Sequence, residues 1–201
     1  MWLLNYSNLI DPLLKNLRDF TVKFVETREG DKILDVGCAT GDQAFHYAKA
    51  GAFATGIDLN AEMIEIAEKR KKKEGIGNID FRVASAFDLP FEDFVFDKAS
   101  ISLALHEIDP GKRNKVISEM KRVVKKDGQL VFIDFSAPLP QNIPSYLVKL
   151  VEYLAGKNNY KNFKSYLNEG GLPSLLQKNS LKEEEMIHFS GGLLTIIKTK
   201  S

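Results

Sequence analysis

The chain has 201 residues, 44% of them hydrophobic and 27% charged, and a formal net charge of +1. This composition predicts one globular domain, and the near-zero charge provides no general attraction to nucleic acid or to a membrane. A single cysteine excludes an internal disulfide, no apolar run reaches the roughly 18 residues that span a bilayer, and Met1–Ser7 lacks the basic start of a signal peptide, so we expect a cytoplasmic protein.

The chain begins with a short aromatic and apolar stretch, followed by a helical pattern. Asp11-Pro12 is typical of a helix start, with an N-cap and a proline at the first helical position. Apolar residues then recur at helical spacing up to Glu29-Gly30. We expect residues 1–30 to form an N-terminal helical cover on a single domain that spans 1–201.

The next stretch predicts a strand, a glycine turn, a helix and a second strand. Ile33–Val36 is a short apolar run of the kind buried on both faces of a parallel sheet. The turn Gly37–Gly41 precedes a helix over Asp42–Lys49 and a strand over Phe53–Ile57. Asp58 then follows Gly37 by 58 − 37 = 21 positions. About 20 positions are expected between a nucleotide-binding turn and the carboxylate that binds a ribose.

The residues that the turn lacks indicate which nucleotide it binds. A dinucleotide turn reads G-x-G-x-x-G, but the three glycine positions here hold Gly37, Ala39 and Asp42. A carboxylate at Asp42 would repel a pyrophosphate at the helix start. Together with Asp35 and Asp58, it favours a ligand with a ribose, no phosphate and a positive charge, which describes S-adenosylmethionine. A glycine turn without any ligand is the alternative.

Here the chain resembles the class I S-adenosylmethionine-dependent methyltransferases, whose first motif is D/E-x-G-x-G-x-G. The matching run is Asp35-Val36-Gly37-Cys38-Ala39-Thr40-Gly41, in which Ala39 replaces the usual middle glycine. The resemblance implies that this turn surrounds the cofactor and that Asp58 binds its ribose. The cofactor-binding residues expected from the motif are Asp35, Gly37, Cys38, Ala39, Gly41 and Asp58.

A helix is expected from Asn60 to Glu74. Met63 lies one helical turn beyond Leu59, and the resembling family often rests the adenine on this pair. The run Arg70–Lys73 is interpreted as a solvated helix end rather than a nucleic-acid patch, since basic residues there complement the helix dipole. By the same resemblance, Tyr6 is a candidate to close over the cofactor, with simple packing as the alternative.

A second signature follows a predicted strand at Ile79–Val83. Residues 84–91 resemble the family motif G-D-A-x-x-L-P-F, and Ala86 matches its alanine. Ser85 replaces the aspartate that accepts a hydrogen bond from the adenine amino group. A hydroxyl accepts more weakly than a carboxylate. The resemblance places Ser85, Ala86 and Phe87 in the cofactor site.

Two further strands are predicted at Phe96–Ile101 and Gln129–Phe135, separated by a helix from Asp109-Pro110 through Val124. Ligands in open α/β sheets bind outside the carboxyl ends of the strands. That rule brings the residues at the strand ends to one rim. We expect the acceptor beside His106 and Asp134. We expect the cofactor at the other four strand ends, which are Gly37, Asp58, Ser85 and Ser102.

His106 is the candidate catalytic residue. Transfer from a sulfonium needs a base only if the acceptor must lose a proton, and histidine titrates near neutrality. The alternative is a structural hydrogen bond. No histidine and carboxylate pair has the spacing of metal ligands, so no metal is predicted.

The last third of the chain is expected to hold the substrate-side insertion, residues 136–180. Ser136–Pro144 contains three prolines and predicts a loop, and Ser145–Ala155 predicts a helix. Candidate pocket or core residues on that helix are Tyr146, Leu150 and Tyr153. Lys157–Gly171 is polar with interspersed aromatics and predicts no particular element. Two strands around a Gly-Gly hairpin are expected within Glu185–Lys198.

A closing antiparallel hairpin is the fold signature of the resembling family. The resemblance therefore implies an α/β, Rossmann-like, doubly wound seven-stranded sheet, mostly parallel, with a C-terminal antiparallel hairpin. The run Ser190-Gly191-Gly192 is also similar to the ubiquinone/menaquinone C-methyltransferase branch, within the type 11 methyltransferases.

The function expected from these residues is methyl transfer from S-adenosylmethionine to a small-molecule acceptor that the sequence does not identify. No nucleic acid or integral membrane segment is expected, and the oligomeric state is left open. One alternative is a non-catalytic S-adenosylmethionine-binding protein of the same fold. The other is an NAD-dependent oxidoreductase, which the missing glycines disfavour.

Overall fold

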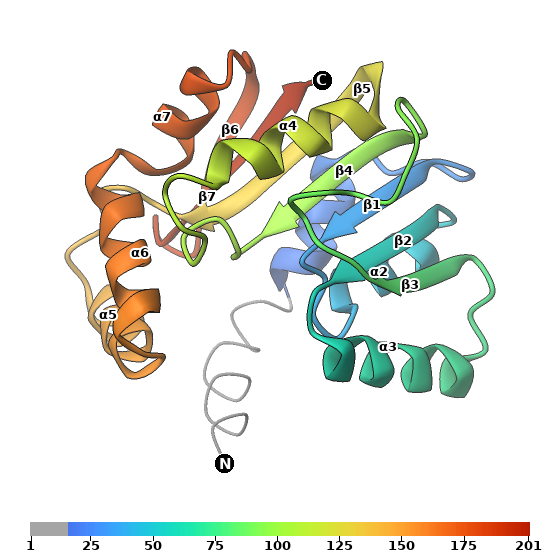
Figure 1. Cartoon of the computed structure of the whole chain (residues 1–201), viewed down its shortest axis with the longest axis horizontal. Helices are drawn as coiled ribbons and strands as arrows, with labels where there is room; N and C mark the ends of the chain where they lie inside the picture. The colour runs from blue at the N-terminus through green and yellow to red at the C-terminus, as the bar shows by residue number, and fades with distance from the viewer. Residues whose placement is uncertain (1–15) are drawn as a thin grey trace.

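The chain folds as a sheet with helices on both faces. The computed structural model describes residues 16–201 (Figure 1). Its strands are β1 (Lys32–Val36), β2 (Phe53–Asp58), β3 (Ile79–Val83), β4 (Phe96–Ser102), β5 (Val124–Phe135), β6 (Glu183–Phe189) and β7 (Leu194–Lys200). Its helices are residues 16–24, α2 (Asp42–Lys49), α3 (Ala61–Glu74), α4 (Arg113–Val123), α5 (Ile143–Leu154), α6 (Lys157–Asn168) and α7 (Gly171–Lys178).

Within residues 16–201 the sheet has seven strands in the order β3-β2-β1-β4-β5-β7-β6. Strands β1 to β5 are parallel, while β7 is antiparallel to both β5 and β6. The order reverses after β3, between β1 and β4, which is where open α/β sheets bind their ligands. The predicted fold class is therefore confirmed.

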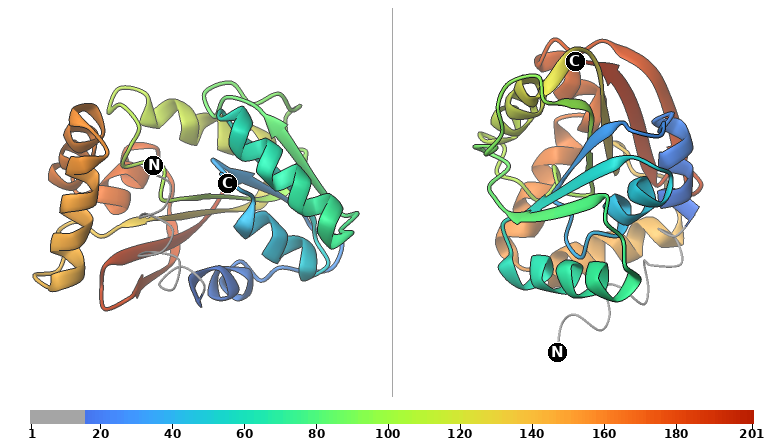
Figure 2. Two further views of the ribbon diagram at one scale, coloured as in Figure 1. Left: turned by 90° about the horizontal axis from the view of Figure 1, so that it is seen from below. Right: turned by 90° about the vertical axis from the view of Figure 1, so that its right-hand side faces the viewer.

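Helices cover the two faces of the sheet in different places. Residues 16–24 and α2 lie on one face and α4 on the other (Figure 2). Helix α3 packs on β2 and β3, and α7 packs on β5. The α3 sequence explains both of its ends: the Asn60 side chain accepts from the Glu62 amide, and Gly75 adopts the left-handed conformation that stops the helix.

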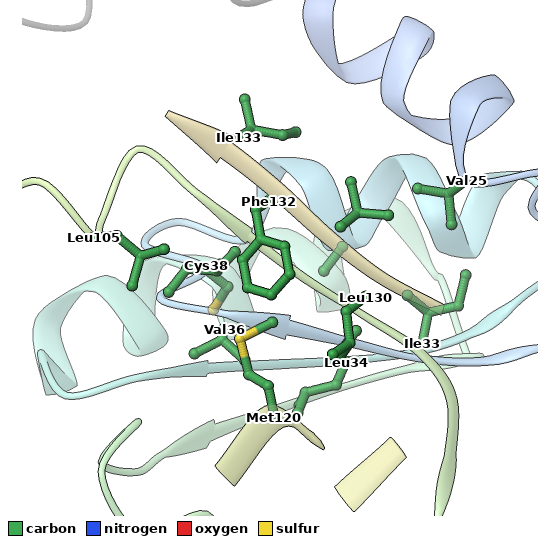
Figure 3. Packing of buried hydrophobic residues seen from close by; sticks show 14 of the residues in the cluster. Val25, Ile33, Leu34, Val36, Cys38, Leu105, Met120, Leu130, Phe132 and Ile133 are labelled. Carbon is green, nitrogen blue, oxygen red and sulfur yellow. The ribbon is translucent and has the colours of Figure 1, made fainter. Parts of the chain in front are cut away.

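The core lies between the central strands and these helices. Ile33, Leu34 and Val36 of β1 are fully buried, as expected for a parallel strand covered on both faces. Figure 3 shows Phe132 of β5 among these side chains, with Met120 of α4 beside them. This packing fixes the strand ends from which the site is built.

Two predicted helix boundaries are wrong. The first helix ends at residue 24 rather than near Glu29-Gly30, because Glu26 adopts a left-handed φ of 51°. Asp109-Pro110 does not start α4. The Asp109 side chain accepts from the Gly111 amide at 2.9 Å and its carbonyl accepts from the Lys112 amide at 2.8 Å, which forms a turn one step before the helix.

The substrate-side insertion is more helical than predicted. Helix α5 begins at Ile143, two residues earlier than expected, because Asn142 caps it by accepting from the Ser145 amide at 3.0 Å. The polar segment that follows, for which no element is predicted, forms α6 and leads into α7. The prediction of Tyr146, Leu150 and Tyr153 as pocket or core residues is wrong, because all three are exposed on the outer face of α5.

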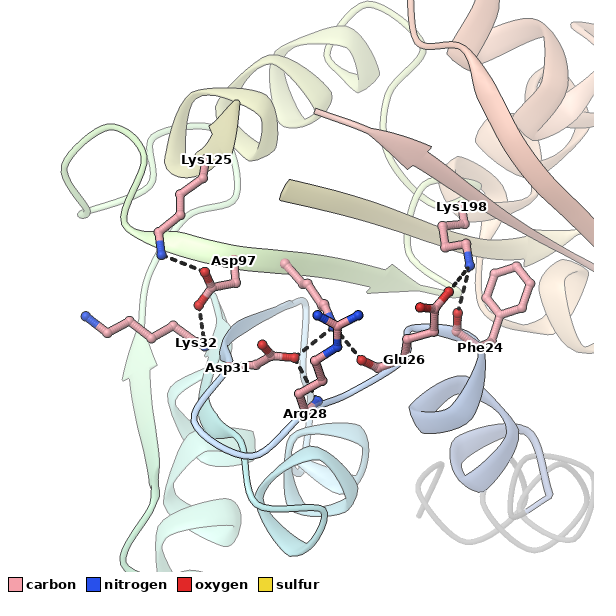
Figure 4. A network of polar contacts seen from close by, with 9 residues as sticks. Phe24, Glu26, Arg28, Asp31, Lys32, Asp97, Lys125 and Lys198 are labelled. Atoms are coloured by element: carbon pink, nitrogen blue, oxygen red, sulfur yellow. Dashed lines mark hydrogen bonds and ion pairs between the residues drawn. The ribbon is translucent and has the colours of Figure 1, made fainter. Parts of the chain in front are cut away.

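A polar network occupies the edge where the parallel strands begin (Figure 4). The Lys98 amino group donates to Asp31 and to the Glu26 carbonyl, both at 2.7 Å. Asp97 accepts from the Lys32 amide at 2.9 Å and from Lys125 at 2.6 Å. These groups pair with one another and fasten the start of β1 to β4.

Among residues 16–201, no helix is both long and apolar enough to cross a bilayer.

Candidate functional site

The turn after β1 is built from left-handed backbone. Gly37, Ala39 and Gly41 have φ values of 69°, 46° and 80°. The Cys38 amide donates to the Ile57 carbonyl at 2.8 Å, which ties the turn to the end of β2. Ala39 is exposed and holds a conformation that disfavours any side chain. This conformation accounts for the glycine usual at that motif position.

Gly41 is required by packing beneath the turn. A Cβ on Gly41 would lie 2.5 Å from the ring of Phe81, which is a buried residue of β3. Gly41 also caps α2 in the left-handed conformation. The glycine therefore serves the docking of α2 on the sheet as well as the shape of the turn.

Asp58 faces the turn from the end of β2. One carboxylate oxygen accepts from the Ala39 amide at 2.9 Å and the other accepts from the Asn60 amide at 2.8 Å. Each carboxylate oxygen has a further lone pair, and the side chain is only partly buried. Asp58 can therefore accept hydrogen bonds from a ribose while it holds the turn.

Asp35 lies under the turn and is 3% exposed. Burial raises the pKa of this carboxyl to about 7, although Ser100 donates to it at 3.2 Å. Its second oxygen has no hydrogen-bond partner among the described residues, and neither has the Tyr47 hydroxyl. An unpartnered buried carboxylate oxygen beside the turn fits a ligand with a cationic group, as S-adenosylmethionine is.

The Cys38 side chain points away from the turn into the core (Figure 3). A Cβ on Gly56 would lie 2.8 Å from the Cys38 sulfur. Burial raises the pKa of this thiol well above its ordinary value. Cys38 can therefore face a ligand only through its backbone.

The predicted adenine side lies at the ends of β2 and β3. Leu59 is exposed directly after β2, and Met63 is partly buried in the first turn of α3. The Ser85 hydroxyl accepts from the Phe87 amide at 3.2 Å and stabilises the loop that contains Ala86. Ser85 can still donate to an adenine nitrogen, whereas the aspartate of the family motif would accept.

The loop after β4 closes the rim beside the turn. Ser102 ends β4 and is partly buried, and Leu103 has a left-handed φ of 53°. A Cβ on Gly37 would lie 3.6 Å from that of Ala104, so this loop contacts the turn. Tyr6 lies outside the described residues. Its predicted role, like the other residue assignments, stays a prediction.

Asp42 takes part in an ion-pair cluster. Its carboxylate contacts Arg18 at 3.2 Å and also pairs with Arg70, whose guanidinium lies 4.1 Å from the centroid of the Phe45 ring. Two arginines offset the negative charge of Asp42. The repulsion predicted between Asp42 and a pyrophosphate is thus weaker than the sequence suggests, and the missing glycines remain the main reason to disfavour a dinucleotide.

On the acceptor side, His106 and Asp134 form a buried pair. His106 Nδ1 donates to Asp134 at 2.6 Å, and the His106 amide donates to the same carboxylate at 3.1 Å. Both side chains are fully buried. The imidazole packs edge-on against the rings of Phe135 and Phe163. The structure therefore brings together the two residues that the strand-end rule predicted here.

Two glutamates complete this cluster, and the sequence indicated neither partnership. His106 Nε2 lies 3.6 Å from the Glu152 carboxylate and 3.8 Å from that of Glu107. Burial alone would lower the pKa of His106, but Asp134 and Glu152 outweigh it and raise the pKa to about 10. The ligand atoms of His106, Glu107 and Glu152 lie within 4.8 Å of one another, close enough to share a cation. A protonated imidazole already supplies positive charge there.

Arg113 fastens the acceptor side to the sheet. Its buried guanidinium donates to the carbonyls of Leu105 at 3.0 Å, Ile108 at 3.1 Å and Asn162 at 2.7 Å. The Tyr166 hydroxyl donates to the Phe135 carbonyl at 3.0 Å. No sequence pattern indicated Arg113, because a basic residue early in a helix is usually solvated. Glu152 had one signal, as the single carboxylate of a largely apolar helix.

Comparison with known proteins finds a matching family model and similar proteins of that family. The model of the ubiE/COQ5 methyltransferase family matches residues 12–169. A demethylmenaquinone methyltransferase of Bacillus subtilis is 30% identical over 195 residues, which cover 89% of this chain and 83% of that protein. The ubiquinone/menaquinone biosynthesis C-methyltransferase UbiE of Citrifermentans bemidjiense is 31% identical, with coverages of 89% and 82%.

Solved structures share the fold. A SAM-dependent methyltransferase from Aquifex aeolicus superposes with a TM-score of 0.71 at 19% identity, over 96% of this chain and 95% of its own. The PH0226 protein from Pyrococcus horikoshii gives a TM-score of 0.72 at 20% identity, over 98% and 91%. These neighbours support the arrangement of the sheet and helices.

Proposed function

Because the chain belongs to the ubiE/COQ5 methyltransferase family, we propose that it methylates a ring carbon of a hydroxylated, quinol-like acceptor. The chain is an S-adenosylmethionine-dependent methyltransferase, and S-adenosylmethionine is its cofactor. The names of the two relatives, for demethylmenaquinone and for ubiquinone/menaquinone, support this acceptor class. The cytoplasmic location expected from the single cysteine is part of the same proposal.

We assign the cofactor to the rim formed by β1, β2 and β3. Asp58 would accept from the ribose hydroxyls, and Leu59, Met63 and Ser85 would border the adenine. The Asp35 carboxyl oxygen that has no hydrogen-bond partner among the described residues would face the cationic end of the ligand. The cofactor supplies a methyl group that its sulfonium activates for in-line displacement. The protein's task is then to hold the acceptor carbon at near-attack distance, on the order of 3 Å.

The buried pair of His106 and Asp134 carries the proposal for the acceptor side. Asp134 fixes the imidazole so that Nε2 points at Glu152 and Glu107. With its pKa raised to about 10, the imidazole is protonated at neutral pH and is a hydrogen-bond donor rather than a base. His106 Nε2 has no hydrogen-bond partner among the described residues, so an acceptor oxygen that displaces Glu152 would receive a hydrogen bond from it.

A protonated His106 would favour the ionised form of a ring hydroxyl. The hydroxyl proton goes to solvent, and the resulting oxyanion donates electron density to the neighbouring ring carbon. That carbon would take the methyl group, the electrons of the broken carbon–sulfur bond would stay on the sulfur of S-adenosylhomocysteine, and the ring proton would then pass to solvent to restore aromaticity. Residues 136–180 provide the opposing wall, since α5 carries Glu152 and α6 carries Phe163.

Turnover with a short-chain demethylmenaquinol analogue tests the proposal. We expect methyl transfer to ring carbon, located by mass spectrometry and NMR, with S-adenosylhomocysteine as co-product. His106→Gln should lower kcat about a hundredfold, which is typical for loss of one donor to a developing oxyanion, and leave cofactor affinity unchanged. His46→Gln is the matched control, because His46 pairs with Asp19 on the surface. Methylation on oxygen, or full activity of His106→Gln, would contradict the proposed role.

A further inference from the structure

Helix α5 is amphipathic, but its apolar face points toward solvent and its more polar face points toward the protein. Six large apolar side chains share its outward face, and each is at least 42% exposed: Ile143, Tyr146, Leu147, Leu150, Tyr153 and Leu154. Their spacing of three and four residues forms one continuous stripe. The buried face holds Ser145, Val148 and Glu152. A surface helix normally turns its apolar side inward, so this stripe requires a partner.

The charges around the stripe are of one sign. Within residues 143–168 the chain has four lysines, which are Lys149, Lys157, Lys161 and Lys164, and one carboxylate, Glu152. All four lysines are exposed, while Glu152 is buried against His106. The whole chain has a net charge of only +1, so this basic surface is local.

The aromatic and basic side chains are arranged in pairs. The Lys149 amino group lies 5.5 Å from the centroid of the Tyr146 ring, and that of Lys164 lies 5.8 Å from the Tyr160 ring. Tyr153 and Tyr160 contact edge to face with centroids 5.5 Å apart, which joins α5 to α6. Figures 1 and 2 show these two helices on the outer flank of the molecule, away from the sheet.

We infer that the α5 stripe and its four lysines dock on an anionic lipid bilayer surface. An apolar helix face inserts at the boundary between headgroups and acyl chains, tyrosines suit that boundary, and flanking lysines attract anionic headgroups. A second copy of the chain fits less well, because a symmetric contact would bring the two sets of lysines together.

This surface lies on the helix that reaches the acceptor side of the site. Glu152, on the inner face of α5, contacts His106. A membrane-soluble acceptor could therefore pass from the bilayer to His106 along α5. This last step rests on the proposed function, whereas lipid binding is measured without cofactor or acceptor. Failure of methyl transfer would leave the docking surface standing.

Co-sedimentation of the full chain with vesicles tests the inference. We expect binding to phosphatidylcholine vesicles that contain phosphatidylglycerol, and weaker binding without it or at high salt. Leu147→Ser with Leu150→Ser should lower the partition coefficient by about tenfold or more. Lys157→Gln and Lys161→Gln should each lower it about fivefold on anionic vesicles only. Phe53→Ser with Ile66→Ser removes two exposed apolar side chains elsewhere and should change nothing.

Four results would overturn the inference. The first is that the full chain binds neither vesicle type. The second is that the control substitutions weaken binding as much as those on α5. The third is concentration-dependent self-association that the α5 substitutions abolish, which would assign the stripe to a second copy. The fourth uses Trp2, the only tryptophan of the chain. A shift of its emission on Leu147→Ser with Leu150→Ser, without vesicles, would assign the stripe to the chain's own N-terminal segment.

Discussion

Asp58 and Asp35 lie on opposite sides of one turn, in different environments. Asp58 is partly exposed, and its carboxylate accepts hydrogen bonds from two backbone amides. Asp35 is buried with one orphan oxygen, and burial favours its neutral form. The two carboxyl groups therefore lead to separate predictions.

Asp58→Ala should weaken binding of S-adenosylmethionine about tenfold to a hundredfold. Hydrogen bonds to a charged group contribute roughly 1.5–3 kcal/mol. Calorimetric titration measures the change. Asp80→Ala is the control, since Asp80 pairs with Arg82 at the surface at 2.7 Å. Unchanged affinity in a folded Asp58→Ala protein would remove Asp58 from the site.

Asp35→Asn should change how stability depends on pH. The folded-state pKa of Asp35 is about 7, above the ordinary value of 3.8, so the folded state holds the proton over that interval. The contribution of Asp35 to the free energy of unfolding therefore falls as pH rises from about 4 to about 7. The Asp35→Asn variant lacks this fall. The free energy of unfolding of the variant minus that of the natural protein should therefore increase with pH by a few kcal/mol over this interval, on the order of 1.4 kcal/mol for each pH unit between the two pKa values.

Urea unfolding without cofactor, at about pH 4.5 and about pH 8, measures this difference. His106 also loses stabilisation at high pH, because its pKa is raised and its stabilising charge is lost as pH rises through about 10. Both proteins retain His106, so the comparison isolates Asp35. Parallel pH profiles for the two proteins would show that Asp35 is not protonated in the folded state.

At the scale of elements, the turn between β1 and α2 contains a correctable strain. Ala39 holds φ at 46°, which costs a residue with a Cβ about 1–2 kcal/mol. Ala39→Gly removes that cost and adds some chain entropy, so the free energy of unfolding should rise by about 0.5–1 kcal/mol. Thermal unfolding measures it, and cofactor affinity should not fall.

Ala50→Gly provides the matched control for Ala39→Gly. Ala50 is exposed at the C-cap of α2, with an ordinary φ of −84°. Glycine at that position should lower stability, because it gains only unfolded-state freedom. If both substitutions lowered stability equally, the left-handed conformation of Ala39 would not be a source of strain.

Elements with a buried apolar run could be predicted from the sequence. The strands β1 to β4 lie where their apolar runs predict them. Strand β5 begins at Val124, five residues before the predicted Gln129, because the polar stretch of residues 125–128 continues the strand, and β6 begins at Glu183, two residues before the predicted hairpin. Helix α5 is predictable as an element, but its orientation is not. Periodicity identifies an apolar face without showing whether that face meets the core or something outside the chain.

The site divides in the same way. The turn residues and Asp58 are local in sequence and share a motif, so they could be placed before the fold was known. The partnership of His106 with Glu152 joins residues from the β4 loop and α5, and depends on how α5 packs. No spacing rule reports such a contact. The same holds for Arg113, whose partners come from the β4 loop and α6.

At the scale of the whole molecule, few polar contacts join the substrate-side helices to the sheet. Arg113 of α4 reaches Asn162, and Asn162 donates back to the Glu107 carbonyl at 2.7 Å. Tyr166 and Glu152 provide two more contacts, to β5 and to His106. The cofactor rim of β1, β2 and β3 lies on the other side of β4 and makes none of these contacts. The two parts can therefore differ in stability.

Arg113→Met should loosen the substrate side before it affects the cofactor rim. It keeps much of the side-chain volume but leaves the carbonyls of Leu105, Ile108 and Asn162 without their donor. Breaking a buried charged network costs about 3–5 kcal/mol. We expect hydrogen exchange to accelerate over residues 136–180 while β1, β2 and β3 stay protected, with cofactor affinity close to that of the natural protein and turnover reduced.

Lys115→Met is the control for Arg113→Met. Lys115 lies on the same helix but is exposed, 3.6 Å from Glu119, and a surface pair contributes at most about 1 kcal/mol. Its exchange pattern should match that of the natural protein. A uniform loss of protection in Arg113→Met would mean that the molecule unfolds as one cooperative unit. The acceptor wall, residues 136–180, then could not open independently of the cofactor rim. Selective loss over residues 136–180 would mean that Arg113 holds the acceptor wall closed, and that an acceptor can enter without disturbing a bound cofactor.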